Sequence, residues 1–121
     1  MTVLGEWSRR PAVTWGNILG WTRDNEVPGT AVVRDDWGRL VTEVYRADGK
    51  LWAVCAAGKP PITLDQLRTA AEAAGVQEDT PVHLDGQNFV NDARVLDLSG
   101  EGAAGPDDDG VHYFTLQRRW G

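Results

Sequence analysis

The sequence predicts one α+β domain in which two helix-plus-three-strand units share a core, with the helices packed on a mainly antiparallel sheet. Two observations support this fold class. A helix-start signal occurs at Thr14 and again at Thr63, and strand-like alternating runs follow each of them. The chain has 121 residues, 41% of them hydrophobic, which suffices for one buried core but not for two independent ones. We therefore expect residues 1–121 to form a single domain.

The second unit is expected over about residues 60–119. Thr63 is a suitable N-cap and Gln66 stands three positions later, so the pair predicts a capping box, and Gly75 supplies a left-handed residue to end the helix. Three strands are expected to follow, at residues 82–84, 93–98 and 111–117. The Gly- and Asp-rich stretch 99–110 is expected to be a flexible acidic loop.

The first unit is expected over about residues 11–57 and has the same order. Thr14 is its N-cap and Asn17 occupies the third helical position. Gly16 and Gly20 lie inside this helix, where each costs roughly 1 kcal/mol relative to alanine, so the helix should depend on packing. Strands are expected near Val32, at 40–45 and at 51–55, the last two joined by the turn 47–50. Duplication would explain this pseudo-repeat, and chance similarity is the alternative.

Two short motifs follow each other within residues 62–98: T-x-x-Q-L at a helix start and D-T-P-V at a strand start. They are formed by Thr63, Gln66, Leu67, Asp79, Thr80, Pro81 and Val82. This succession resembles small domains of unknown function from high-GC actinobacteria, in which an acidic turn joins the same two motifs. The resemblance implies a fold element and a source in an actinobacterium or one of its phages, and it implies no activity.

Net charge and cysteine content restrict the partners and the compartment. The net charge is −6, and the whole acidic excess falls in residues 59–121. Because such a balance cannot release counterions from a duplex, nucleic-acid binding is disfavoured, whereas a basic protein partner would be attracted. A single cysteine, no apolar run long enough to cross a bilayer and no basic head before an apolar N-terminal segment predict a cytoplasmic protein without membrane contact.

Chemistry-bearing motifs are sparse in this sequence. Cys55 is the only cysteine and lies in an apolar strand, where a thiol usually behaves as a small buried hydrophobe. His83 and Asp85 share a strand face but lack metal-site spacing with a second histidine, and the Asp107–Asp109 run lacks the calcium-loop pattern. No phosphate-binding glycine order is present. We therefore expect no metal, no cofactor and no catalytic residue.

Tryptophan is unusually frequent, with six residues in the chain. Trp15 and Trp52 correspond to apolar residues of the second unit and are expected in the core. Trp37 differs, because it lies in the Asp35-Asp36-Trp37-Gly38 turn, where burial is hard to arrange. Its ring is expected either to pack over the hairpin or to contact a partner. Exposed tryptophan is enriched at interface hot spots. The predicted partner-binding set is therefore Trp37, Asp35, Asp36, Trp21 and Trp7.

Two functions of different classes follow from these features. The first is a small non-catalytic protein-binding factor, of the inhibitor, immunity or anti-defence type. The alternative is a small-ligand-binding or sequestering protein, with a site between the two units lined by tryptophan, Tyr45, His83 and Asp85. A third hypothesis is an enzyme that uses Cys55 or His83. A fourth is mimicry of nucleic acid by the acidic face, although the carboxylates cluster mostly in loops.

Overall fold

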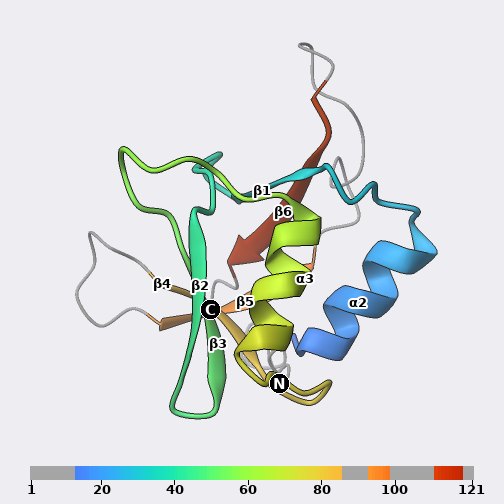
Figure 1. The fold of residues 1–121 in the computed structure, drawn as a ribbon, viewed down its shortest axis with the longest axis vertical. Helices are drawn as coiled ribbons and strands as arrows, with labels where there is room; N and C mark the ends of the chain where they lie inside the picture. The colour runs from blue at the N-terminus through green and yellow to red at the C-terminus, as the bar shows by residue number, and fades with distance from the viewer. Residues whose placement is uncertain (1–12, 86–92, 99–110, 119–121) are drawn as a thin grey trace, which may run out of the picture.

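The computed structural model describes residues 13–85, 93–98 and 111–118, and Figure 1 shows their arrangement. Two helices, α2 (Trp15–Asp24) and α3 (Leu64–Ala73), pack on one six-stranded sheet. The strands are β1 (Val32–Asp35), β2 (Glu43–Ala47), β3 (Lys50–Val54), β4 (Val82–Asp85), β5 (Ala93–Leu98) and β6 (Tyr113–Arg118). Their order in the sheet is β1-β6-β5-β4-β3-β2. The α+β class is thus confirmed.

The sheet is mixed, because β1 and β6 run parallel, as do β3 and β4, while the other neighbouring pairs are antiparallel. Both parallel pairs join a strand of the first half of the chain to a strand of the second. Three of the five neighbouring pairs agree with the predicted mainly antiparallel sheet, and the two parallel pairs were not predicted. The pairing places strands of both halves in one sheet over one core.

Both helices begin at the predicted capping boxes. Thr14 Oγ1 accepts the backbone N–H of Asn17 at 3.2 Å, and Asn17 Oδ1 accepts the N–H of Thr14 at 3.0 Å. The same exchange joins Thr63 and Gln66, at 3.2 and 2.9 Å. Each box satisfies two backbone donors that a helix start otherwise leaves open. The two threonines therefore set where α2 and α3 start.

A close approach between backbones accounts for one glycine of α2. The N–H of Gly16 donates to the carbonyl of Glu78 at 2.8 Å, and a Cβ on Gly16 would lie 2.9 Å from that same oxygen. A side chain does not fit at this distance. The intrinsic weakness of α2 is thus partly a requirement of its docking against the segment before β4.

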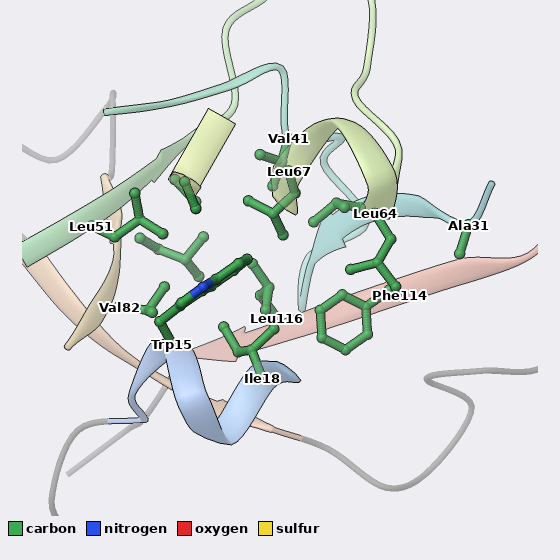
Figure 2. Packing of buried hydrophobic residues seen from close by; sticks show 14 of the residues in the cluster. Trp15, Ile18, Ala31, Val41, Leu51, Leu64, Leu67, Val82, Phe114 and Leu116 are labelled. Atoms are coloured by element: carbon green, nitrogen blue, oxygen red, sulfur yellow. The ribbon is translucent and has the colours of Figure 1, made fainter. Parts of the chain in front are cut away.

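The core lies between the helices and one face of the sheet. Figure 2 shows the indole of Trp15 in the middle of this cluster, with Ile18 of α2 and Leu116 of β6 beside it. Leu64 of α3 and Phe114 of β6 are fully buried in the same cluster. The expected burial of Trp15 is confirmed. Residues from both halves of the chain build this single core.

Two sequence-based expectations are wrong in detail. Trp52 is half-buried and stands on the sheet face opposite the core, because Leu51 and Ala53 beside it take the inward positions. The strand expected from residue 40 begins at Glu43, because the preceding Val41 bonds sideways to β1, its N–H donating to the carbonyl of Val33 at 2.9 Å. The predicted loop 99–110 lies outside the described residues.

Candidate functional site

The turn that follows β1 is organised by one buried carboxylate. Asp35 Oδ1 accepts the backbone N–H of Trp37 at 2.9 Å and that of Arg39 at 2.8 Å, while Oδ2 accepts Arg39 Nε at 2.9 Å. The Asp35 side chain is fully buried. Gly38 closes the turn with a φ of 81°, a region that residues other than glycine rarely adopt. Backbone and side-chain bonds thus converge on Asp35 and hold the turn in one conformation.

Trp37 projects from this turn with 46% of its surface exposed. The guanidinium of Arg39 lies over its ring, with Cζ 4.7 Å from the ring centroid. A cation above an indole restricts the ring without covering it completely. Because Asp35 holds Arg39 in turn, the large exposed ring is supported by a fixed side chain. The sequence left open whether this tryptophan packs over the hairpin or contacts a partner, and in the structure nearly half of its surface is exposed.

A surface groove of about 400 Å³ lies beside Arg39. It is lined by Arg39, Leu40, Thr42, Cys55, Ala56, Ala57 and Lys59. Arg39 and Lys59 are the charged residues of this lining, and the rest is apolar or small. Lys59 Nζ bonds to Glu43 Oε2 at 3.0 Å, in an ion pair that is open to solvent. We refer to Trp37, Arg39, Leu40 and Lys59, together with this groove, as the Trp37 surface.

Cys55 forms part of the groove wall but is itself buried. Its Sγ lies 3.8 Å from the carbonyl oxygen of Arg39 and 4.0 Å from Asp35 Oδ2. A thiol in this position packs beneath the turn and donates weakly to it. The arrangement fits the structural interpretation of Cys55 better than that of a nucleophile.

The predicted partner-binding residues do not all come together. Asp35, Asp36 and Trp37 share the turn, but Asp35 cannot contact a partner because its carboxylate is buried and satisfied inside the turn. Trp21 is half-buried on α2 and packs against Phe114, with ring centroids 5.6 Å apart. Trp7 lies outside the described residues. Of the predicted set, Trp37 and Asp36 therefore remain candidates for direct contact at this turn.

Three residues of the Trp37 surface escaped the sequence analysis. Arg39 carried a usable signal, since a cation four positions after Asp35 across a glycine-containing turn favours an ion pair. Leu40 was predicted to lie in a strand. It is exposed because the segment before β2 bonds to β1 through Val41. Lys59 carried no signal at all, because only the tertiary fold brings it beside Arg39.

Two of the predicted ligand-binding residues, Tyr45 and His83, belong to a row of rings on the opposite sheet face. Tyr45 of β2 pairs in register with Trp52 of β3, and Trp52 pairs with His83 of β4. The ring centroids are 6.3 Å apart for Tyr45 and Trp52, and 5.1 Å apart for Trp52 and His83. The planes of Tyr45 and Trp52 differ by 13°, so these two rings stack on each other. The row joins the first half of the chain to the second.

His83 is buried within this row, and its titration is perturbed. Burial lowers the pKa of His83 from its usual value of 6.5, and the charge of Lys50 lowers this pKa further. The imidazole is therefore neutral at neutral pH. Its Nδ1 is buried and has no hydrogen-bond partner among the described residues. The expected partnership with Asp85 lies outside the described side chains.

Within the described residues, no group of three or more His, Cys, Asp or Glu side chains is arranged to hold a metal ion. None of the helices in the same part of the chain has the length and apolar character needed to cross a membrane. Comparison of the chain with models of protein families, with curated proteins and with solved structures finds no match.

Proposed function

We propose that the chain is a small non-catalytic protein-binding factor that contacts its partner through the Trp37 surface. The observation that carries this proposal is an exposed tryptophan on a turn that a buried carboxylate holds in place. Tryptophan and arginine are the residues most enriched at interface hot spots, and here they stack on each other. The proposal extends the sequence-based prediction from Trp37 alone to Arg39 and the groove.

Rigidity is the energetic reason to favour this surface. Ordering an interface side chain on binding costs about 0.5–1.5 kcal/mol, and a preorganised turn avoids much of that cost. Three hydrogen bonds to Asp35 order the turn before any partner arrives. A central tryptophan typically contributes about 2 kcal/mol or more to such an interface. The same ring on a loose loop would contribute less.

The biological class of the factor rests on sequence features. Small size, sparse chemistry and the resemblance to actinobacterial domains favour an inhibitor, immunity or anti-defence protein that acts in the cytoplasm on a protein partner. The acidic excess of residues 59–121 favours a partner with a basic surface elsewhere in the contact.

Parallel affinity captures from a high-GC actinobacterial lysate test the proposal. The baits are the natural chain, Trp37→Ala and Tyr45→Ala, the last being a second exposed aromatic away from the turn. We expect one protein to be retained by the natural chain and by Tyr45→Ala and to be lost from Trp37→Ala. Equal retention by all three baits, or no specific capture in repeated attempts, would overturn the proposal.

A second candidate function is small-ligand binding at the ring row. One observation favours it: His83 Nδ1 is buried without a partner among the described residues, so a ligand that bonds to it would satisfy a polar atom that folding leaves open. Small-molecule additions followed by tryptophan fluorescence test this candidate. A quench that persists in Trp37→Phe and disappears in Trp52→Phe supports it, and a quench with the opposite dependence contradicts it.

We also propose that the two halves are related by duplication. Parallel β1·β6 corresponds to parallel β4·β3, and antiparallel β6·β5 corresponds to antiparallel β3·β2. Both halves open with a Thr-capped helix. Relatives whose halves resemble each other more closely would support duplication, and relatives that lack one of the two capping boxes and its parallel pair would contradict it.

A further inference from the structure

The two edges of the sheet differ in how their backbone groups are satisfied. At the β1 edge, the N–H of Val33 donates to the carbonyl of Ile62 at 3.1 Å, and the carbonyl of Val33 accepts the N–H of Val41 at 2.9 Å. Segments beside the sheet thus cover β1. β2 stands at the opposite end of the strand order, and in the described part of the chain no strand pairs with its outer side. An edge of this kind is a template for another strand.

The hairpin geometry identifies the open backbone groups of β2. The residues that flank its two-residue turn, 48–49, exchange both of their hydrogen bonds, and so does every second pair along the ladder. Val44 and Arg46 fall between these pairs and direct their N–H and C=O groups away from β3. Leu51, the residue opposite Arg46, agrees with this alternation, because its N–H donates to the carbonyl of Pro81 on the β4 side at 2.9 Å.

These outward groups of β2 are open along the edge. Within the described residues, no backbone bond from beyond the hairpin reaches Val44 or Arg46. The side chain of Arg46 does not bond across the edge, because its Nη1 donates to the carbonyl of Ala74 at 3.1 Å, at the end of α3. Unpaired strand groups bond to water or to another strand. Two positions of β2 therefore offer a donor and an acceptor each.

An antiparallel second copy of β2 satisfies all of these groups in one register. With Tyr45 opposite its counterpart, Val44 of each copy stands against Arg46 of the other, and each such pair exchanges two N–H···O bonds. A register shifted by two residues in one direction opposes the two Arg46 side chains, which carry like charges. A shift in the other direction sets Arg46 against Thr42, whose N–H already donates to the carbonyl of Val54 at 2.8 Å. The strand is therefore self-complementary about Tyr45.

The ring row of the outer sheet face extends toward the same contact. Tyr45 stacks on Trp52 with ring centroids 6.3 Å apart, and 42% of its surface is exposed. Opposed residues of a non-hydrogen-bonded pair have Cα atoms about 4.5 Å apart, which brings the two Tyr45 rings within contact distance. Aromatic pairs across neighbouring strands stabilise a sheet. The ring row of one copy would thus continue into that of the other.

We propose that two copies of the chain form a symmetric dimer by pairing their β2 strands antiparallel, with the two Tyr45 residues at the two-fold axis. This axis is perpendicular to the sheet, so the helices of both copies lie on the same side of one continuous sheet. Because the β1 edge is covered, the assembly closes as a dimer and does not grow. The inference goes beyond the proposed function and does not use the Trp37 surface.

Sedimentation velocity over a range of concentrations tests the dimer. The mass is expected to rise from that of one chain to that of two, with a Kd of about 1–100 μM for so short a strand pair. Arg46→Pro removes an N–H that no bond within the chain uses, and it should raise the Kd at least about tenfold. Arg46→Ala is the matched control, because it loses the same side chain and keeps the N–H, and it should change the Kd less than about twofold.

Cysteine cross-linking tests the register without a proline. In Tyr45→Cys the two new thiols face each other at a spacing suited to a disulfide. In Glu43→Cys, on the same strand and sheet face, they stand about 13 Å apart along the paired strands and cannot be bridged. The natural Cys55 is buried and is common to both variants. With oxidised glutathione as the oxidant, a non-reducing gel should show a covalent dimer forming at least about tenfold faster from Tyr45→Cys.

A natural chain that keeps the mass of one copy up to about 500 μM would overturn the inference. Cross-linking of Glu43→Cys as fast as that of Tyr45→Cys would refute the register, and equal Kd values for folded Arg46→Pro and Arg46→Ala would refute the edge contact. If circular dichroism shows that Arg46→Pro is unfolded, the cross-linking rates decide. Trp37→Ala should still dimerise while it loses partner capture. Dissociation of Trp37→Ala would assign the contact to the Trp37 surface and end this inference.

Discussion

Removing the Asp35 carboxylate is the perturbation that most directly tests how the candidate site is built. In Asp35→Ala the amides of Trp37 and Arg39 lose their acceptor, and Arg39 Nε loses its ionic partner. Breaking a buried ion pair by removing one partner costs about 3–5 kcal/mol. The Arg39 side chain is 30% exposed and can turn to water, so we expect about 3 kcal/mol, at the lower end of that range.

Asp35→Asn separates the two roles of the carboxylate. An amide oxygen at the Oδ1 position can still accept both backbone N–H groups, whereas the amide nitrogen would face Arg39 Nε, donor against donor. We expect Asp35→Asn to lower the free energy of unfolding by about 2 kcal/mol, which is less than the effect of Asp35→Ala and more than that of a control substitution. Asp24→Asn is the control substitution, because its ion pair with Arg23 is exposed and such pairs contribute less than about 1 kcal/mol.

Urea denaturation followed by tryptophan fluorescence measures these free energies of unfolding. Native-state hydrogen exchange adds a local measurement, since the amides of Trp37 and Arg39 should lose protection in Asp35→Ala before the core does. We expect Asp35→Ala to lower the free energy of unfolding most, Asp35→Asn less, and Asp24→Asn least. A cost for Asp35→Ala below about 1 kcal/mol, with both amides still protected, would show that the carboxylate does not organise the turn.

Two further predictions concern α2 and the ring row. Gly16→Ala should lower the midpoint of thermal unfolding, because the new Cβ would lie 2.9 Å from the Glu78 carbonyl oxygen. Gly20→Ala should raise the free energy of unfolding by about 0.5–1 kcal/mol, because its new Cβ would lie 3.7 Å from the flexible side chain of Arg23 and meet no backbone. A more stable Gly16→Ala than Gly20→Ala would contradict the close approach at Gly16. Because burial and then Lys50 depress the pKa of His83 in the folded state, the unfolded chain binds the proton first, so stability should fall as pH drops below 6.5 toward the folded pKa. Urea denaturation at several pH values should show a smaller fall in His83→Gln, and an identical pH dependence would refute this assignment.

Local features of the fold were readable from the sequence because their causes are local. Thr14 and Thr63 correctly predicted both helix starts, because a capping box needs residues only three positions apart. The turn at Asp48 and Gly49 was predicted correctly, and both residues have positive φ as the type I′ geometry requires. Trp15 was predicted to lie in the core because it corresponds to Leu64, an apolar residue of the second unit.

Long-range pairing was not readable in the same way. Nothing near Val32 in the sequence indicates that β1 will run parallel to β6, which lies at the other end of the chain. The position of Trp52 on the outer face depended on strand register, and a shift of one residue reverses the faces. Lys59 joins Arg39 only through the path of the chain after β3. The site was therefore predicted as a turn, and its groove was not.

Trp37 is expected to contribute strongly to partner binding and little to the free energy of unfolding, and both contributions can be measured. The base of the Trp37 turn is tied to the core, because Val41 bonds to Val33 of β1 and Ile62 bonds to Val41, each at 2.9 Å. Its tip is outside the core, where the contact of the ring with Arg39 is worth about 0.5–1 kcal/mol. We therefore expect Trp37→Ala to lower the free energy of unfolding by about 1 kcal/mol or less while it removes partner capture.

Trp37→Phe is the companion variant, since it keeps an aromatic face for Arg39 and a smaller surface for a partner. It should retain the stability of the natural chain and an intermediate share of the binding, as measured by urea denaturation and by quantitative capture. A loss of stability in Trp37→Ala as large as that of Asp35→Ala would contradict this expectation, because it would assign the tryptophan to the structure of the turn. Equal binding by the Phe and Ala variants, both far below the natural chain, would instead assign recognition to the full indole.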